Sequence, residues 1–411
     1  MAEGASVFLM DLAVVMGVAA IATVVFHRFR QPVVLGYLLA GLVVGPYTPP
    51  FAFVHDIETI EILGELGVVF LLFALGLEFN FRKLRRVGVA AILSGAAQAA
   101  IMVWLGYVVG ILVGFTPLEA LFLGAVISIS STVIIVKVVA AFGQQEEEWA
   151  QLVFGILIVE DVVAVILLTL ISAGAAAGGF TAVALGVVLG KLLLFLAAAL
   201  VLGLWIVPWL VGYVARQGVP EVLVVTVLGL AFGLAVLGGL LGFSAALGGF
   251  IMGALIAESD ALHQVEELIH PIRDMFTAIF FVAIGMLVDP RLLLENWAII
   301  LVVSLVVVVG KILAGSMATF FAGYDHHTAL RVGFGLAQIG EFSFVIAALV
   351  VATYGGLSAP LFAIAVSVTA ITSFTTPLLI RVAPRAVAVF DRRAPQPLLT
   401  FLSLYSGWWQ R

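Results

Sequence analysis

The stretch LGYLLAGLVVG, at residues 35–45, recurs in the second half of the chain as LGGFIMGALIA, at residues 247–257. The second copy keeps a leucine and two glycines of the first at a shift of 212 residues, so that Gly41 corresponds to Gly253. Small residues also recur by chance in apolar helices, because they line helix contacts. The recurrence therefore predicts an internal duplication only if further blocks return with it.

Two further blocks return in the same order as the first. FALG at 73–76 matches VAIG at 282–285 in its alanine and glycine, and ALFLG at 120–124 matches ALRVG at 329–333. Both pairs are related by a shift of 209 residues. Three blocks in one order favour duplication over chance, so we expect two structural repeats.

The composition is that of a chain embedded in a membrane. Hydrophobic residues make up 64% of it and charged residues 10%, and the mean hydropathy is +1.28, which excludes a soluble globular domain. Residues 1–15 contain no Lys or Arg, so the first apolar run is predicted to be a retained helix and not a cleaved signal peptide. The absence of cysteine excludes disulfides and cysteine-ligated metals.

Apolar runs long enough to cross a bilayer are separated by charged residues, glycine and proline. About thirteen spans are predicted, at residues 5–26, 32–46, 58–78, 87–114, 117–140, 149–173, 182–214, 221–240, 243–258, 271–288, 294–322, 328–354 and 358–382. The two copies of the first block begin in the second and ninth spans, which are an odd number of spans apart. The two copies therefore enter the membrane from opposite sides. The sequence thus predicts an all-α polytopic membrane protein with an inverted repeat.

The distribution of Lys and Arg predicts the orientation of the spans. With the N-terminus outside and the C-terminus in the cytoplasm, fifteen of the eighteen basic residues fall on the cytoplasmic side and only Arg291 falls outside. The remaining two, Lys191 and Lys311, fall within spans. If one span had been missed, every loop after it would be assigned to the wrong side of the membrane. The asymmetry of Lys and Arg therefore also supports the number of spans.

Polar residues and glycine interrupt one span in each repeat. SISST lies at residues 128–132, and the shift of 209 residues aligns it with AQIGE at residues 337–341. A single serine usually bonds to the carbonyl of the preceding turn, which leaves its helix continuous. Interruptions at corresponding depths predict instead two broken crossing helices, whose unwound backbone lines a cavity.

Two adjacent acids lie in the apolar run GILIVEDVVAVILL, where a charge costs about 2.5 to 3.5 kcal/mol even on insertion scales. Carboxylate, hydroxyl and carbonyl oxygens are the ligands that hard cations prefer. The residues predicted to bind Na⁺ or K⁺ and protons are Asp161, Glu160, Thr132, Ser131 and Ser130. Without the cation, a desolvated Asp161 favours its protonated form, so one carboxylate can hold either ion. A purely structural Asp161 is the alternative.

Three further charged residues complete the predicted site. Lys311, in VVVVGKILAGSM, is assigned as the counter-ion of Glu160, since buried charges are usually paired. A static ion pair that only fixes helix packing is the alternative. Glu341 is expected to compensate the dipole ends of the opposite broken helix, or to act as a cation ligand or proton relay. Arg331 is expected at the cytoplasmic entrance of its span, where snorkelling is the default interpretation.

Seven motifs, in one order over nearly the whole chain, resemble a known family: VLGYLLAGLVVGP, LGELGVVFLLFALGLEF, SISSTVIIV, VEDVVAV, SAALGGFIMGALIAES, FFVAIGMLVD and QIGEFSFV. This family is the monovalent cation:proton antiporters, in the branch of glutathione-gated potassium efflux systems and bacterial sodium/proton antiporters. The resemblance implies exchange of Na⁺ or K⁺ for protons by alternating access, with Asp161 as the binding carboxylate and no cofactor. A cation channel and a sodium-coupled organic-anion symporter are the alternatives. An enzyme is not expected, because no nucleophile, metal or nucleotide motif is present.

The resemblance also implies a homodimer and a core that moves like an elevator. The expected parts are a dimerisation part at 1–86 and 217–290, a core at 87–173 and 291–382, a linker helix at 174–216 and a cytoplasmic tail at 383–411. Many relatives continue into a regulatory domain, so the expected partners are membrane lipid and a cytoplasmic regulatory domain or subunit, and not nucleic acid. The expected location is the inner (plasma) membrane.

The first of the two adjacent acids departs from the family pattern. Electrogenic sodium/proton exchangers of the family carry Asp-Asp, and the potassium efflux systems carry Gln-Asp, whereas this chain has Glu160 before Asp161. The presence of two adjacent acids resembles the electrogenic sodium/proton exchangers, whereas most of the other motifs resemble the potassium efflux systems. Ion preference and stoichiometry are therefore left open by the sequence.

Overall fold

The computed structural model describes most of the chain, and its described residues include no strand. The described ranges are 2–29, 33–48, 53–54, 57–78, 81–176, 182–241, 243, 245–286, 288–354, 359–397, 400 and 402. The end of the predicted tail, 403–411, lies outside them.

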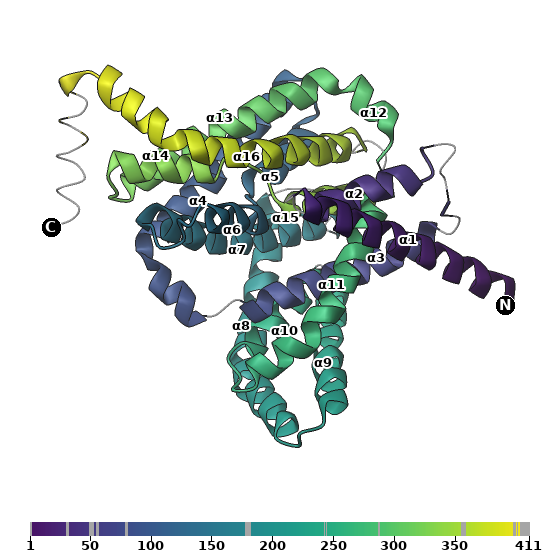
Figure 1. Ribbon diagram of the computed structural model, residues 1–411. Helices are drawn as coiled ribbons and strands as arrows, with labels where there is room; N and C mark the ends of the chain where they lie inside the picture. Colours follow the sequence, from purple (N-terminus) through teal and green to yellow (C-terminus); the bar gives the residue numbers. More distant parts are fainter. Residues whose placement is uncertain are drawn as a thin grey trace. The chain divides into compact units, whose positions relative to one another are not determined.

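Helices account for nearly all of these segments (Figure 1). Their bounds are α1 Ala2–Arg28, α2 Val33–Val44, α3 Ile57–Glu78, α4 Phe81–Leu112, α5 Pro117–Ser128, α6 Thr132–Ala141, α7 Glu148–Ala176, α8 Ala182–Ala215, α9 Pro220–Leu240, α10 Ala245–Ile256, α11 Leu262–Met286, α12 Pro290–Glu295, α13 Trp297–Phe321, α14 His326–Gly335, α15 Glu341–Tyr354 and α16 Ala359–Arg393. Each predicted span coincides with one of these helices or with two consecutive ones. The predicted all-α fold is confirmed.

Eight of the described helices are long and apolar enough to cross a membrane, by length and composition. Five further apolar helical stretches have 10–17 residues, among them α2, α5 and α10. Because a helix rises about 1.5 Å per residue, a helix of twelve residues such as α5 is too short for a core of roughly 30 Å by itself. A multi-pass membrane protein is confirmed, and thirteen crossings stays a prediction.

Two predicted spans are broken helices, as the polar interruptions indicated. Residues 129–131 separate α5 from α6, and residues 336–340 separate α14 from α15. The backbone leaves the helical conformation at Ile129, with φ −97° and ψ 129°. The new helix then starts on a serine cap, because the hydroxyl of Ser131 accepts a hydrogen bond from the backbone N–H of Ile134 at 3.3 Å.

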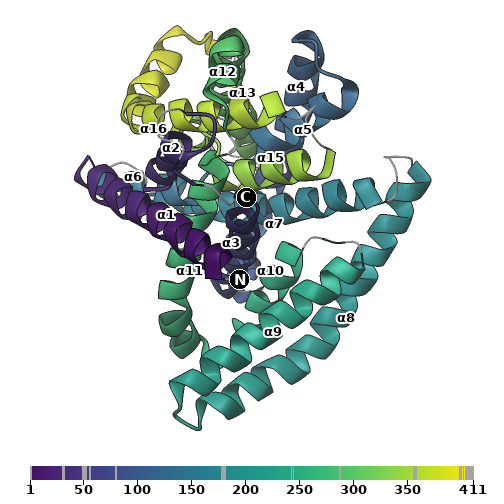
Figure 2. The same ribbon diagram turned by 90° about the vertical axis from the view of Figure 1, so that its right-hand side faces the viewer.

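The chain forms two compact units. One comprises Met1–Lys83 and Leu168–Pro290, and the other comprises Leu84–Leu167 and Arg291–Arg411. In the first unit, α1, α3 and α11 share a buried apolar cluster, and α8 and α9 lie side by side (Figure 2). In the second, α6, α7 and α14 contribute to another cluster.

Close glycine contacts in the first unit follow the sequence repeat. Gly41 of α2 faces Gly285 of α11, and a Cβ atom on either glycine would collide with a backbone carbonyl of the other helix. Gly253 of α10 faces Gly76 of α3 in the same way. The repeat relates Gly41 to Gly253 and Gly285 to Gly76, so one contact between helices occurs twice. This recurrence confirms the internal repeat.

The second unit repeats a glycine contact of its own. Gly106 of α4 packs on Gly124 of α5, and Gly315 of α13 packs on Gly333 of α14. The shift of 209 residues relates both members of one pair to both members of the other. The first half of each broken helix therefore packs against the preceding long helix at a corresponding position.

The first halves of the two broken helices also begin alike. Gly114 before α5 and Gly323 before α14 have φ values of 94° and 101°, which L-residues rarely adopt. Thr116 then caps α5, and Asp325 caps α14, through hydrogen bonds to N–H groups of the first turn. These residues again correspond at the shift of 209, so the local signals that start each half-helix are repeated.

Three helices differ from the predicted spans. α16 continues to Arg393, past the predicted end at 382, and α11 begins at Leu262 instead of 271. α4 contains a non-helical residue, Gly88, with φ 83° and ψ 153°. The spans were predicted from hydrophobicity, whereas residues such as Ala, Leu, Glu and Arg continue a helix into water. The first part of the predicted tail is therefore helical.

Candidate functional site

The two adjacent acids lie on α7, and both are buried. Glu160 has no exposed surface, and Asp161 is 6% exposed. Successive residues of an α-helix point about 100° apart, so the two carboxylates leave the helix in different directions. One acid can therefore be fixed by protein contacts while the other serves a different role.

The carboxylate of Glu160 is held at the break between α5 and α6. Its Oε2 atom accepts a hydrogen bond from the backbone N–H of Ser130 at 2.6 Å, and Nζ of Lys311 lies 3.9 Å from the same oxygen. Both charged side chains are fully buried, so each depends on the other for charge compensation. The bond to Ser130 replaces the helical partner that its N–H loses at the break.

Lys311, on α13, contacts the same break. Its Nζ atom donates hydrogen bonds to the carbonyl oxygen of Ser128 at 2.9 Å and to Oγ of Ser130 at 2.7 Å. These two bonds use two of the three donors of the ammonium, and its charge is paired with that of Glu160 at 3.9 Å. The pair thus satisfies a backbone donor and a backbone acceptor that unwinding would leave bare, as non-helical backbone at membrane depth requires.

The two breaks are hydrogen-bonded to each other. The backbone N–H of Ser131 donates to Oε1 of Gln338 at 2.7 Å, and Nε2 of Gln338 donates to the carbonyl oxygen of Ser131 at 3.2 Å. The backbone N–H of Gly340 donates to the carbonyl oxygen of Ile129 at 3.1 Å. The hydroxyl of Ser130 also lies 3.3 Å from the carbonyl oxygen of Leu336. Side-chain and backbone bonds therefore fix one unwound segment against the other.

Gly340 explains how closely the two unwound segments approach. A Cβ atom at this position would meet the backbone of Ser130 and Ser131 within 2.8 Å. Gly340 is also the residue that the repeat aligns with Ser131. The glycine predicted to break its helix is thus needed for the contact between the two breaks as well.

Buried oxygens at this site are available to a cation. Among the described residues, neither Oγ1 of Thr132 nor Oε1 of Glu160 has a hydrogen-bond partner. A buried polar oxygen is costly unless water or an ion satisfies it. With the carboxylate of Asp161, such oxygens are ligands that suit Na⁺ or K⁺.

The other two predicted site residues lie on the second broken helix. Glu341 is the first residue of α15, and its side chain is outside the part that the structure describes. Arg331, on α14, forms an ion pair with Glu147, and its guanidinium lies 4.8 Å from the ring centroid of Trp149. Arg331 therefore joins α14 to the start of α7, where a guanidinium stacked on an aromatic ring is attracted by the ring face.

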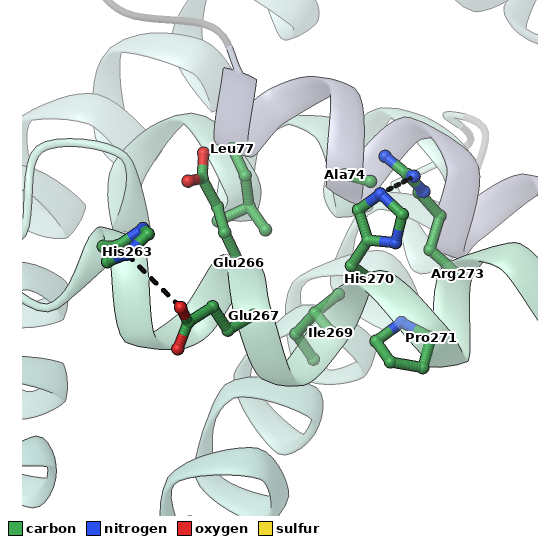
Figure 3. Close-up of a pocket in the computed structure, with 9 residues that line it drawn as sticks. All are labelled: Ala74, Leu77, His263, Glu266, Glu267, Ile269, His270, Pro271 and Arg273. Carbon is green, nitrogen blue, oxygen red and sulfur yellow. Dashed lines mark hydrogen bonds and ion pairs between the residues drawn. The ribbon is translucent and has the colours of Figure 1, made fainter.

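A surface pocket in the first unit contains none of the predicted site residues. It is lined by residues of α3 and α11: Ala74, Leu77, His263, Glu266, Glu267, Ile269, His270, Pro271 and Arg273 (Figure 3). The lining histidines contact acids or arginine on their own helix, as the pair of His263 and Glu267 shows. This pocket therefore does not mark the buried acids.

Sequence reasoning missed Gln338 and the role of the carbonyl of Ser128. Gln338 is the polar residue in the interrupted stretch AQIGE, and it lies between residues that were considered. An uncharged amide carries no insertion cost comparable to that of a carboxylate, so it was not singled out. Its ability to both donate and accept, which a broken backbone needs, is the signal that could have identified it.

Comparison with known proteins gives similarity over most of the chain. The family described as "Sodium/hydrogen exchanger, transmembrane" matches residues 15–381. The Bacillus subtilis (strain 168) protein named K(+)/H(+) antiporter subunit KhtU is 31% identical over 351 residues, which are 83% of this chain and 85% of that protein. The Escherichia coli (strain K12) protein YbaL, which bears a cation/proton antiporter name, is 35% identical over 332 residues.

These similarities differ in how much of each protein they cover. The E. coli match includes 79% of this chain but 59% of YbaL, so the chain spans about three fifths of that relative. The solved structure of the sodium proton antiporter MjNhaP1 from Methanocaldococcus jannaschii at pH 8 aligns with a TM-score of 0.66 and 17% identity, over 92% of this chain and 97% of that one. The structural likeness concerns the fold.

Proposed function

This chain belongs to the sodium/hydrogen exchanger family, and from that premise we propose that it exchanges a monovalent cation, Na⁺ or K⁺, for protons across a membrane. The observation that supports the proposal most is the buried polar cluster at two helix breaks in an otherwise apolar chain. Buried charge at membrane depth is costly and marks ion pathways. A single carboxylate that exchanges a cation for a proton must be accessible from each side of the membrane in turn, and this mechanism is alternating access.

Asp161 is the proposed exchanging residue. It holds a partly dehydrated cation in one half of the cycle and a proton in the other, so that the site crosses the membrane with its charge compensated. Among the predicted hydroxyl ligands, Oγ of Ser130 already accepts a hydrogen bond from Lys311 at 2.7 Å. Thr132, whose buried Oγ1 has no partner among the described residues, is therefore the preferred hydroxyl ligand, with Ser131 beside it.

Glu160 and Lys311 are proposed to position the site. Their bonds to the break between α5 and α6 support this role, because they satisfy backbone groups that no helix satisfies there. Glu341 begins α15, where a negative charge near a helix N-terminus is favourable, and is proposed to compensate that dipole end. Arg331 is proposed to lie at the cytoplasmic entrance.

The proposal extends to the assembly. The contacts among Glu160, Lys311, Ser130 and Gln338 all fall within the compact unit of Leu84–Leu167 and Arg291–Arg411, so the site can move as one body. This unit is proposed as the mobile core, and the other as the dimerisation part of a homodimer in the plasma membrane. The name of the relative KhtU as a subunit supports a regulatory partner.

Asp161→Asn tests the function. The asparagine has nearly the same shape but cannot alternate between a charged and a protonated form, so coupled exchange should disappear. The measurement uses proteoliposomes with an acidic interior, in which added Na⁺ or K⁺ restores the fluorescence of a pH-gradient dye. The matched control is Glu65→Gln, which removes an exposed carboxylate from α3 and should retain exchange. Normal exchange by folded Asp161→Asn protein would contradict the assignment.

The same assay separates exchange from its two rivals. A channel would move Na⁺ or K⁺ down a gradient without dissipating the pH gradient, provided that the membrane potential is clamped. A sodium-coupled organic-anion symporter would show cation-dependent uptake of an organic anion. Comparing Na⁺, K⁺ and Li⁺ with and without an imposed potential then identifies the ion and the charge moved per cycle.

A further inference from the structure

Two histidines and an aspartate that are distant in the sequence converge outside the exchange site. His326 and His327 form the first turn of α14, and Asp391 lies near the end of α16. Nε2 of His326 lies 2.9 Å from Oδ1 of Asp391, and Nε2 of His327 lies 2.9 Å from Oδ2 of the same carboxylate. One carboxylate thus faces two imidazoles, each through a different oxygen.

The chemistry and spacing of these three side chains suit a divalent transition metal. One ligand atom from each residue can be chosen so that all three lie within 4.8 Å of one another. Two imidazole nitrogens and a carboxylate oxygen are the ligand types of zinc sites with three protein ligands, which have bonds of about 2.0 to 2.2 Å and a water in the fourth position. The side chains of His326 and His327 are 19% and 54% exposed, so water and metal can reach the cluster.

Carboxylates beside the two imidazoles favour a bound cation, and neutral imidazoles are the form that binds metal. Both histidines lie at the N-terminus of α14, where the positive end of the helix dipole opposes a cation and the carboxylates of Asp391 and Asp325 offset it. Asp325, whose Oδ1 lies 3.8 Å from Nδ1 of His327, adds a negative charge. Arg392 and Arg393 follow in the exposed last turn of α16, where solvent screens them.

We propose that His326, His327 and Asp391 form a site for a first-row divalent transition metal such as Zn²⁺, which ties the start of α14 to the end of α16. The proposal does not depend on ion exchange, because it concerns metal binding by residues that the exchange site does not use. One consequence does rest on the proposed function. α14 leads directly into the break that holds Gln338, so a metal that restrains α14 should slow exchange.

Binding is tested on the purified full chain without a polyhistidine tag. Isothermal titration with Zn²⁺ at pH 7.5 should give one site per chain, and Co²⁺ should give the visible absorption of a low-coordinate complex. His327→Gln and Asp391→Asn should each weaken Zn²⁺ binding by at least about tenfold, since even residues behind the ligands contribute about 10- to 100-fold to metal affinity. Affinity should also fall as the pH is lowered, because protons compete with the metal for the imidazoles.

The matched control is His263→Gln, which removes an exposed histidine whose Nε2 lies 3.3 Å from Glu267 on α11. This variant should bind Zn²⁺ as the wild type does. All variants are compared by thermal unfolding without metal, so that a folding defect is recognised. Absence of stoichiometric binding by the wild type, or unchanged affinity in folded Asp391→Asn protein, would overturn the site and leave the proposed exchange function untouched.

Discussion

Lys311 contacts the break between α5 and α6 in three ways. It compensates Glu160, and it donates to a carbonyl and a hydroxyl of the same unwound turn. Neutral residues could hydrogen-bond those groups, so the charges need a further explanation. Burying an ion pair is costly, and removing one partner of a buried pair is also costly because the other charge is left uncompensated. The two charges are therefore held in one specific geometry. The pair can therefore fix the shape of the turn beside Asp161.

Glu160→Gln should destabilise the protein. The glutamine can still accept the hydrogen bond from Ser130, but it leaves Lys311 buried without a counter-ion, which costs about 3 to 5 kcal/mol. Replacing Lys311 by methionine in the same chain removes the uncompensated charge, so the double variant should be more stable than Glu160→Gln alone. Thermal unfolding in detergent, followed by tryptophan fluorescence, measures both effects.

Asp161→Asn is the control for that comparison, because it neutralises the neighbouring acid without removing the counter-ion of Lys311. Its unfolding midpoint should stay closer to that of the wild type than the midpoint of Glu160→Gln. If Glu160→Gln unfolds like the wild type, Glu160 does not compensate Lys311 in the way its 3.9 Å separation indicates.

At the scale of helices, glycines determine which elements approach most closely. The contacts of Gly41 with Gly285 and of Gly253 with Gly76 bring two pairs of helices near enough for backbone atoms to touch. Lipid chains are as apolar as leucine, so helix association in a membrane relies on such packing. The repeated glycines are therefore the residues through which the duplicated sequence specifies duplicated packing.

Gly41→Ala should separate α2 from α11. The added Cβ atom collides with the backbone carbonyl of Val282, which cannot move aside as a flexible side chain could. Overpacking of this kind costs roughly 1 to 3 kcal/mol, so the thermal unfolding midpoint should fall. The matched control is Gly229→Ala on α9, where no atom lies within 4 Å of the new Cβ, and alanine should stabilise that helix by up to about 1 kcal/mol.

Gly253→Ala should have an effect similar to that of Gly41→Ala, because the two contacts correspond in the repeat. The two substitutions lie at different helix contacts, so their losses should add to within about 0.3 to 0.5 kcal/mol. A harmless Gly41→Ala, or a Gly229→Ala that is equally damaging, would argue that the close approach is not what these glycines provide.

The sequence predicted the helices and their breaks well because both depend on local signals. Apolar length predicts a span, and serine or glycine at mid-membrane predicts an interruption. The partners of the interruptions could not be predicted, since Gln338 meets Ser131 across 207 residues. The histidine cluster could not be predicted either, since Asp391 meets His327 across 64 residues. The extension of α16 from residue 382 to Arg393 was not predicted, because the apolar run ends there while the residues that follow still favour a helix.

At the scale of the whole chain, the contacts of Asp391 constrain how many times the chain crosses the membrane. Asp391 meets His326 and His327, so the end of α16 lies on the same side as the start of α14. Two membrane crossings between these points, one by α14 with α15 and one by α16, satisfy this requirement, and an odd number would not. The predicted topology places both points in the cytoplasm, as the distribution of Lys and Arg requires.

Cysteine labelling tests this topology directly, because the chain has no cysteine and an introduced thiol is the only one. Gln217→Cys, in the exposed turn between α8 and α9, should be protected from a membrane-impermeant maleimide in intact cells and labelled in inverted vesicles. Arg291→Cys, exposed at the start of α12, should show the opposite pattern, because three predicted spans separate the two positions. Reversal of both patterns would invert the orientation while keeping the repeat. Labelling of both cysteines from one side would require an even number of crossings between them, and the inverted repeat would then be wrong.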